Sequence, residues 1–256
     1  SLVLILMLPE SIRYLVLKQA PQEKVRALLV RITGEDPGEE ASFSRTTKPA
    51  GSPVPELFRN SLATGTVLIW ITFFMSLLVF YLLSSWLPLL ITTAGFSMAN
   101  ASLMAATLAT GGTVGAVVIG RLMDRFDPHR VLALAYLLAG GFVMLLGATV
   151  GTPWLLVASI FGAGFGVAGA QVGVNALAAA YYPTAIRATG VSWANAVGRT
   201  GSVLGSMVGG FLLSLGWDLT TVFSVAAGPL FIAAAAMLFK ASLSARKAAL
   251  RPVAAE

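Results

Sequence analysis

The chain has 256 residues, of which 57% are hydrophobic and only 11% charged, and its mean hydropathy of +0.83 indicates a membrane protein rather than a soluble domain. It contains no cysteine and a single histidine, so disulfides, thiolate metal sites and a histidine metal cluster are excluded, and we expect no metal and no cofactor. The net charge of +6 comes from basic residues at the ends of apolar runs, which marks membrane topology and excludes nucleic acid as an expected partner.

The first 60 residues divide into two parts. Residues 1–8 form a short apolar run, which we interpret as the end of a preceding transmembrane helix, so we expect the chain to be the C-terminal part of a longer polypeptide. Residues 9–60 are the extended polar region and are predicted to be a cytoplasmic central loop. It begins as an amphipathic helix, with apolar residues at i, i+3, i+4 and i+7, and continues as a flexible linker rich in Gly, Ser and Pro. The apolar positions are Val25, Leu28, Leu29 and Ile32.

Residues 61–240 are predicted to be a six-helix transmembrane bundle, and residues 241–256 a cytoplasmic C-terminal tail. The run from Asn60 to Gly120 is 61 residues long and the run from Val131 to Ile186 is 56, and neither carries a charge. A single crossing needs about 20 residues, so each run is long enough for two. The expected spans are 64–87, 99–120, 131–149, 154–182, 189–215 and 219–239.

The basic residues give the expected topology. The connections 88–98, 150–153 and 216–218 contain no Lys or Arg, whereas the other connections are basic. By the positive-inside rule the uncharged connections face outward, and both ends of the chain lie in the cytoplasm.

Glycines recur four residues apart in three of the predicted spans. This spacing allows helix backbones to approach closely in lipid, where no hydrophobic force drives helices together. It predicts a closely packed neighbour for each of these helices, either inside this chain or in another bundle. The glycines are Gly111 and Gly115, Gly162 and Gly166, and Gly201, Gly205 and Gly209.

Arg199 is the exception to the charge pattern, because it falls near the middle of the fifth predicted span. An arginine at this depth costs roughly 2.5–3.5 kcal/mol on insertion scales. One interpretation is structural, with Arg199 paired to a helix-end carbonyl or to an acid from another span. The other, which we favour, is a cation that faces a water-filled cavity and holds an anionic substrate. The predicted spans contain no acid, so a proton-carrying carboxylate would lie outside them.

Other polar and aromatic residues could complete such a pocket. Gln171 and Asn175 lie at i and i+4 on one helix face, and amides in lipid need partners, either another helix or a ligand. Trp193 and Asn195 precede Arg199 in its own span. Aromatic residues of the first span could stack on a ring, with lipid contact or packing as the alternative for them. These are Trp70, Phe73, Phe74 and Tyr81, and Phe74 is included in the predicted site.

The segment Gly120-Arg121-Leu122-Met123-Asp124-Arg125-Phe126-Asp127-Pro128-His129-Arg130 resembles the cytoplasmic loop signature of the major facilitator superfamily, in the copy that belongs to the second six-helix half. It departs from the usual form at Asp127-Pro128-His129. The resemblance covers essentially the whole chain. It implies an all-α membrane protein whose six-transmembrane-helix bundle is the C-terminal half of that fold.

A second segment, Tyr182-Pro183-Thr184-Ala185-Ile186-Arg187-Ala188-Thr189-Gly190-Val191 followed by Gly198-Arg199-Thr200-Gly201, resembles the aromatic acid:proton symporter family. This resemblance implies proton-coupled uptake of small aromatic carboxylates, such as hydroxybenzoates, at a bacterial inner membrane. It also implies that Asp124, His129, Arg187 and Arg199 match positions important for transport.

In such folds two bundles rock about a central site, and charged loops hold the cytoplasmic side closed in one state. We assign Asp124, Arg125 and Arg130 to this latch, with topology marking as the alternative. Arg187 is expected at the cytoplasmic mouth, as latch or anchor. His129 could titrate near neutral pH or be a hydrogen-bonded bystander.

The sequence thus predicts a secondary transporter. Its expected partners are a small anionic substrate, protons, the lipid bilayer and a missing N-terminal six-helix half. The alternatives are a porter or exporter of another organic acid and a half-size protein that dimerises with itself. An enzyme is not expected, because the spans hold no Asp, Glu, His or Cys.

Overall fold

The computed structural model describes residues 15–16, 20–34, 38, 54–59, 62–93 and 95–249. The chain forms two compact units, Ser1–Gly51 and Ser52–Glu256. The predicted helix end at residues 1–8, most of the predicted linker and the last residues of the tail lie outside the described residues.

The first unit contains α3 (Gln22–Thr33), which confirms the helix predicted from the apolar spacing. Val25 on its apolar face is buried, whereas Ile32 is exposed. The helix ends at Gly34, whose φ of 74° lies in the left-handed region that favours glycine and whose backbone N–H donates to the carbonyl of Val30.

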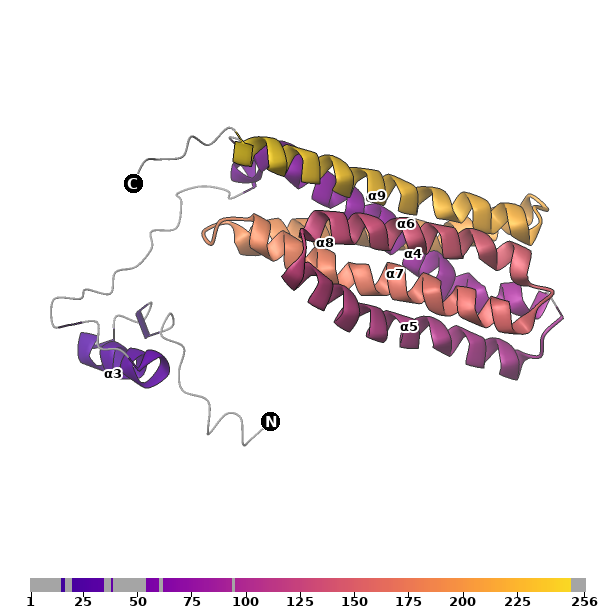
Figure 1. Cartoon of the computed structure of the whole chain (residues 1–256), viewed down its shortest axis with the longest axis horizontal. Coiled ribbons are helices and arrows are strands. Elements are labelled where there is room, and N and C mark those ends of the chain that lie inside the picture. The colour runs from indigo at the N-terminus through magenta and orange to yellow at the C-terminus, as the bar shows by residue number, and fades with distance from the viewer. Residues whose placement is uncertain are drawn as a thin grey trace. The chain divides into compact units, whose positions relative to one another are not determined.

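The second unit begins with a short 3-10 turn, η1 (Pro55–Phe58), and continues as a bundle of six long helices that share one long axis (Figure 1). Within the part of the chain that the structure describes, this confirms the predicted helical bundle. Several ends have clear local causes, since the Ser97 hydroxyl and the Asp127 carboxylate each accept a backbone N–H of the following helix. The helices are α4 (Ala63–Thr93), α5 (Met98–Arg125), α6 (Pro128–Thr149), α7 (Pro153–Tyr181), α8 (Arg187–Ser214) and α9 (Leu219–Ala249).

Five of these helices are long and apolar enough to cross a membrane, and α8 is the sixth long helix. With 28 residues α8 has sufficient length, but Arg187, Arg199, Asn195 and its many Gly and Ser residues lower its hydropathy. The helix α9 is longer than predicted. It continues ten residues past the predicted end of the last span and so includes Lys240.

The glycines of α8 pack against α4. A Cβ atom on Gly201 would overlap the carbonyl oxygen of Phe74, and one on Gly205 would overlap that of Leu78. The predicted close neighbour of α8 is therefore α4, inside this chain. From Gly201 to Gly205 in α8 the contact moves from Phe74 to Leu78 in α4, so the two helices run parallel.

A second glycine seam joins α5 and α7. A Cβ on Gly111 or Gly115 would overlap the backbone of α7, and one on Gly164 would overlap the carbonyl of Leu108 in α5. The helices α6 and α9 also lie in extensive contact. The helix α7 also contacts α4 and α8, and its face that carries Gln171 and Asn175 lines a pocket with these two helices.

Candidate functional site

A polar pocket of about 210 Å³ lies between α4, α7 and α8. It contains four of the six residues predicted from sequence for the substrate site. These four come from two helices at i, i+4 spacing, which turns both side chains of each pair to one face. The lining residues are Leu77, Phe80, Tyr81, Ala168, Gln171, Asn175, Asn195 and Arg199.

Arg199 supplies the charge of this pocket. It lies twelve residues after the start of α8 and is exposed, and its Nη1 donates to the Tyr81 hydroxyl at 3.5 Å. Within the described residues no acidic side chain forms an ion pair with it. The Tyr81 hydroxyl thus contacts the guanidinium, but it is not an acidic partner for its charge.

The asparagines of the pocket bond to each other across two helices. Asn195 Nδ2 donates to Asn175 Oδ1 at 3.3 Å and to the carbonyl of Val191 at 3.0 Å. Asn175 Nδ2 in turn donates to the backbone carbonyl of Gln171 at 2.7 Å. This connection holds α7 and α8 together at the pocket. Gln171 differs, because its Oε1 is buried without a hydrogen-bond partner.

The other two predicted residues lie outside the lining of this pocket. Trp193 stacks on Trp70, with ring centroids 6.0 Å apart and an interplanar angle of 18°. Phe74 contributes its backbone carbonyl to the Gly201 contact. The lining residues that the sequence did not single out are Leu77, Phe80 and Ala168, and only their helical spacing from Tyr81 and Gln171 could have indicated them.

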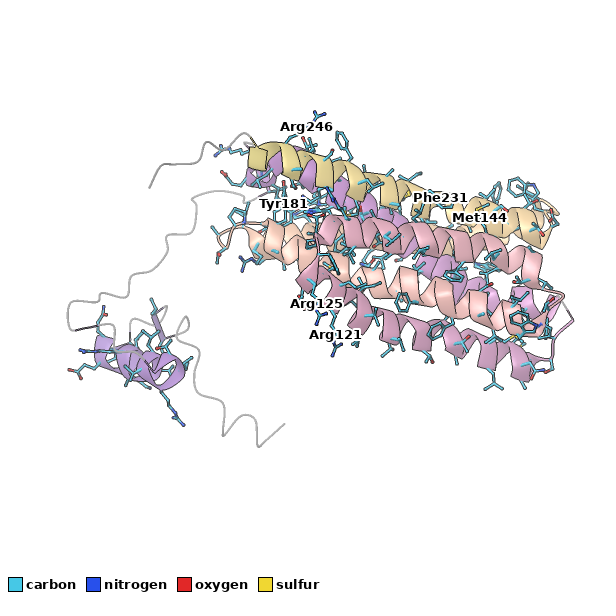
Figure 2. All side chains as sticks on the ribbon, in the orientation of Figure 1. Arg121, Arg125, Met144, Tyr181, Phe231 and Arg246 are labelled. Carbon is cyan, nitrogen blue, oxygen red and sulfur yellow. The ribbon has the colours of Figure 1, made fainter. Side chains whose placement is uncertain are left out.

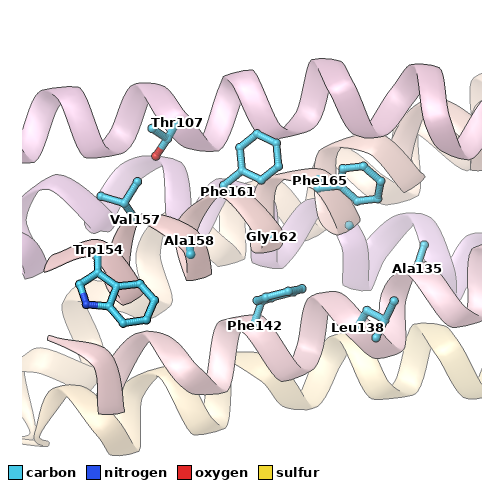
Figure 3. A pocket seen from close by; sticks show the side chains of 11 residues that line it. Thr107, Ala135, Leu138, Phe142, Trp154, Val157, Ala158, Phe161, Gly162 and Phe165 are labelled. Atoms are coloured by element: carbon cyan, nitrogen blue, oxygen red, sulfur yellow. The ribbon is translucent and has the colours of Figure 1, made fainter. Parts of the chain in front are cut away.

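A larger cavity of about 600 Å³ lies between α5, α6 and α7 (Figure 3). Its lining is almost entirely apolar, with Phe142, Phe161, Phe165 and Trp154 as the large side chains. It holds no charged residue and therefore offers no cation to pair with an anion. The smaller pocket at Arg199 is the candidate site because of its chemistry, not its size.

The residues predicted for the latch lie where α5 ends and α6 begins. Asp124, Arg125 and Arg130 are exposed, and none of them forms an ion pair with another described residue. Figure 2 shows Arg121, Arg125, Tyr181 and Arg246 toward one end of the bundle. The charged side chains are thus free to engage a second surface.

His129 and Arg187 have local partners. His129 Nδ1 lies 3.5 Å from Asp127 Oδ2, at the N-cap of α6. Arg187 Nε donates to the carbonyl of Tyr182 and its Nη2 to the Thr184 hydroxyl, both at 3.4 Å. Arg187 therefore braces the turn between α7 and α8.

Sequence reasoning missed a buried cation nearby. Lys240 is 3% exposed, and its Nζ lies 3.5 Å from the centroid of the Tyr181 ring. The Tyr181 hydroxyl donates to the carbonyl of Leu62 at 2.9 Å. Because Lys240 is the first residue of a basic cluster, its sequence position indicated a solvated helix end.

Long apolar helices around a polar, cationic pocket define a multi-pass membrane protein. The Major Facilitator Superfamily family model matches residues 25–140 and 69–254. The chain belongs to the major facilitator superfamily, and the predicted fold class is confirmed.

The relatives agree with this assignment. The chain is 42% identical to a gallate transporter of Pseudomonas putida over 91% of this chain and 52% of the relative. It is 40% identical to the 4-hydroxybenzoate transporter PcaK of Pseudomonas aeruginosa, over 95% of this chain and 55% of the relative. A 3-(3-hydroxy-phenyl)propionate transporter of Escherichia coli is 34% identical over 84% of this chain and 52% of that protein. The chain thus spans about half the length of these relatives.

Proposed function

We propose that this chain is one half of a secondary transporter that takes up small aromatic carboxylates together with protons by alternating access. Two independent observations support the proposal. The relatives named above transport gallate, 4-hydroxybenzoate and a hydroxyphenylpropionate, all of which are aromatic acids. The pocket offers a guanidinium without an acidic partner among the described residues, at mid-length of the helices.

The unpaired charge of Arg199 is the observation that carries the proposal. A carboxylate can accept two parallel hydrogen bonds from a guanidinium, and this pairing is stronger in a site shielded from water. The Tyr81 hydroxyl lies on the same side of the pocket and accepts a long hydrogen bond of 3.5 Å from Arg199. Phe80 and Leu77 supply apolar contact for the body of the substrate.

The relatives are about twice as long as this chain, and we propose that a second six-helix bundle covers the exposed face of Arg199. Asp124, Arg125 and Arg130 would form ion pairs with that bundle when the cytoplasmic side closes, with His129 and Arg187 as nearby members of the latch. The predicted spans carry no acid, so the proton-carrying carboxylate is assigned to the second bundle. The proposed location is a bacterial inner membrane, with both ends of this chain in the cytoplasm.

The test is uptake of radiolabelled 4-hydroxybenzoate by cells that express the full-length protein with Arg199→Gln or Arg199→Lys. Hydrogen bonds to charged groups contribute about 1.5–3 kcal/mol, so we expect Arg199→Gln to raise KM roughly 10- to 100-fold. Arg199→Lys should retain part of the affinity, because it keeps the charge but loses the fork of donors.

Arg246→Gln is the matched control, since Arg246 is an exposed cation near the end of α9, a helix that contributes no residue to the pocket lining. Its uptake should equal that of the wild type. If Arg199→Gln retains the wild-type KM and rate, Arg199 does not bind the substrate. If aliphatic acids compete as well as benzoates, the protein is a porter of another organic acid.

A further inference from the structure

Gln171 carries an acceptor that the folded chain leaves unused. Several buried polar atoms of the described residues have no hydrogen-bond partner, and Gln171 Oε1 is the one whose residue lines the polar pocket. A buried amide oxygen without a partner costs free energy, because it has lost its hydrogen bonds to water. Such an atom in a binding pocket indicates a missing donor.

The neighbouring amides cannot supply that donor in the observed arrangement. The side-chain nitrogen of Asn175 is directed to the backbone carbonyl of Gln171, and that of Asn195 to Asn175 Oδ1 and to the carbonyl of Val191. Asn195 thus donates to Asn175, Asn175 donates to the Gln171 backbone, and the Gln171 side-chain oxygen is left unpaired. Within the pocket, Asn175 and Asn195 act as positioning residues that fix α7 against α8.

The pocket therefore has two poles on different helices. Arg199 on α8 offers donors and a positive charge, while Gln171 on α7 offers an acceptor. Leu77 and Phe80 of α4 lie in the same lining and provide apolar surface. A ligand that matches both poles has a carboxylate, a flat apolar body and a hydroxyl donor that is separate from the carboxylate.

Building on the proposed function, we propose that Gln171 accepts a hydrogen bond from a ring hydroxyl of the bound aromatic carboxylate and so selects hydroxylated benzoates over benzoate. Benzoate would fill the pocket yet leave the Gln171 oxygen buried and unpaired. A hydroxylated acid gains a hydrogen bond to this buried acceptor, whereas benzoate leaves the acceptor as unpaired as it is in the free protein, so the site favours the hydroxylated acid.

The test compares binding of 4-hydroxybenzoate and benzoate to the full-length protein in detergent, for the wild type, Gln171→Met and Gln171→Leu. The wild type should prefer 4-hydroxybenzoate, and both variants should lower that preference about tenfold. The affinity for benzoate should stay the same or increase, which also shows that the variants are folded. Salicylate is a control ligand, because its hydroxyl lies beside the carboxylate and bonds to it internally.

The outcomes separate this inference from the proposed function. If the wild type binds none of these acids, the proposed function fails and the inference with it. If the wild type binds them and the variants keep the wild-type preference, only the role of Gln171 is overturned. An equal loss of affinity for all three acids in both variants also overturns it, since Gln171 would then support the shape of the pocket instead of accepting a hydrogen bond from the ring hydroxyl.

Discussion

Two cations inside the apolar helices are compensated in different ways. Lys240 is buried against the face of the Tyr181 ring, whose π electrons attract a cation. Arg199 is exposed and meets the neutral hydroxyl of Tyr81. Lys240 thus has a structural explanation inside the bundle. Arg199 forms no ion pair with any described residue, which favours a role in binding.

The Lys240 contact leads to a stability prediction for Tyr181. Tyr181→Phe keeps the ring under Lys240 but removes the hydrogen bond to the Leu62 carbonyl, so it should cost about 1 kcal/mol. Tyr181→Leu removes both interactions and should cost roughly 2 kcal/mol more, because the cation–π contact is shielded from water. Thermal unfolding of the purified protein in detergent measures both losses. Equal losses for the two variants would show that the ring does not stabilise Lys240.

At the scale of elements, the low hydropathy of α8 has a packing cause. Its glycines lie against carbonyl oxygens of α4, and its asparagine and arginine face the pocket. A helix whose sides are occupied by a close neighbour and by a polar site has fewer positions left for large apolar residues. Its composition therefore reflects its place between α4 and α7.

This packing predicts opposite effects for two Gly→Ala substitutions. Gly205→Ala places a methyl group onto the Leu78 carbonyl, so the α4–α8 pair must separate, and we expect a loss of about 1–3 kcal/mol. Gly141→Ala in α6 is the matched control, since no atom lies within 4 Å of the new methyl group. It should gain roughly 0.5–1 kcal/mol from helix propensity.

Thermal unfolding and uptake, measured on both glycine variants, check this prediction. A separation of α4 from α8 moves Tyr81 away from Arg199, so Gly205→Ala should also raise KM. Gly205→Ala with wild-type stability would contradict the tight seam. A destabilised Gly141→Ala would show that the open space around this glycine is filled in the membrane.

At the scale of the whole molecule, the sequence predicted the helices well because a charge-free run longer than a bilayer leaves the chain few alternatives. It also brought Gln171, Asn175, Asn195 and Arg199 into one site, since i, i+4 spacing fixes a shared face. Trp193 lies outside the lining of this pocket and stacks on Trp70, an arrangement that depends on how α8 is rotated against α4. That rotation follows from glycine contacts between helices far apart in sequence, which periodicity along one helix does not contain.

The orientation of the bundle is the property that the charge pattern predicts and that labelling can test. Figure 2 shows Arg121 and Arg125 of α5 and Arg246 of α9 toward one end of the bundle, whereas the connections 150–153 and 216–218 carry no Lys or Arg. The chain has no cysteine, so a single introduced thiol reports its own side of the membrane. Gly151→Cys lies in an exposed connection with open space around it, and Arg246→Cys lies at the basic end.

In intact spheroplasts, a membrane-impermeant maleimide should label Gly151→Cys at once and Arg246→Cys only after the membrane is opened. This result follows from the retention of Lys and Arg on the cytoplasmic side. Labelling of Arg246→Cys in intact spheroplasts would place the proposed latch outside. The Arg199 pocket would then be reached through the opposite mouth, and Asp124, Arg125 and Arg130 would close the outward path instead of the cytoplasmic one.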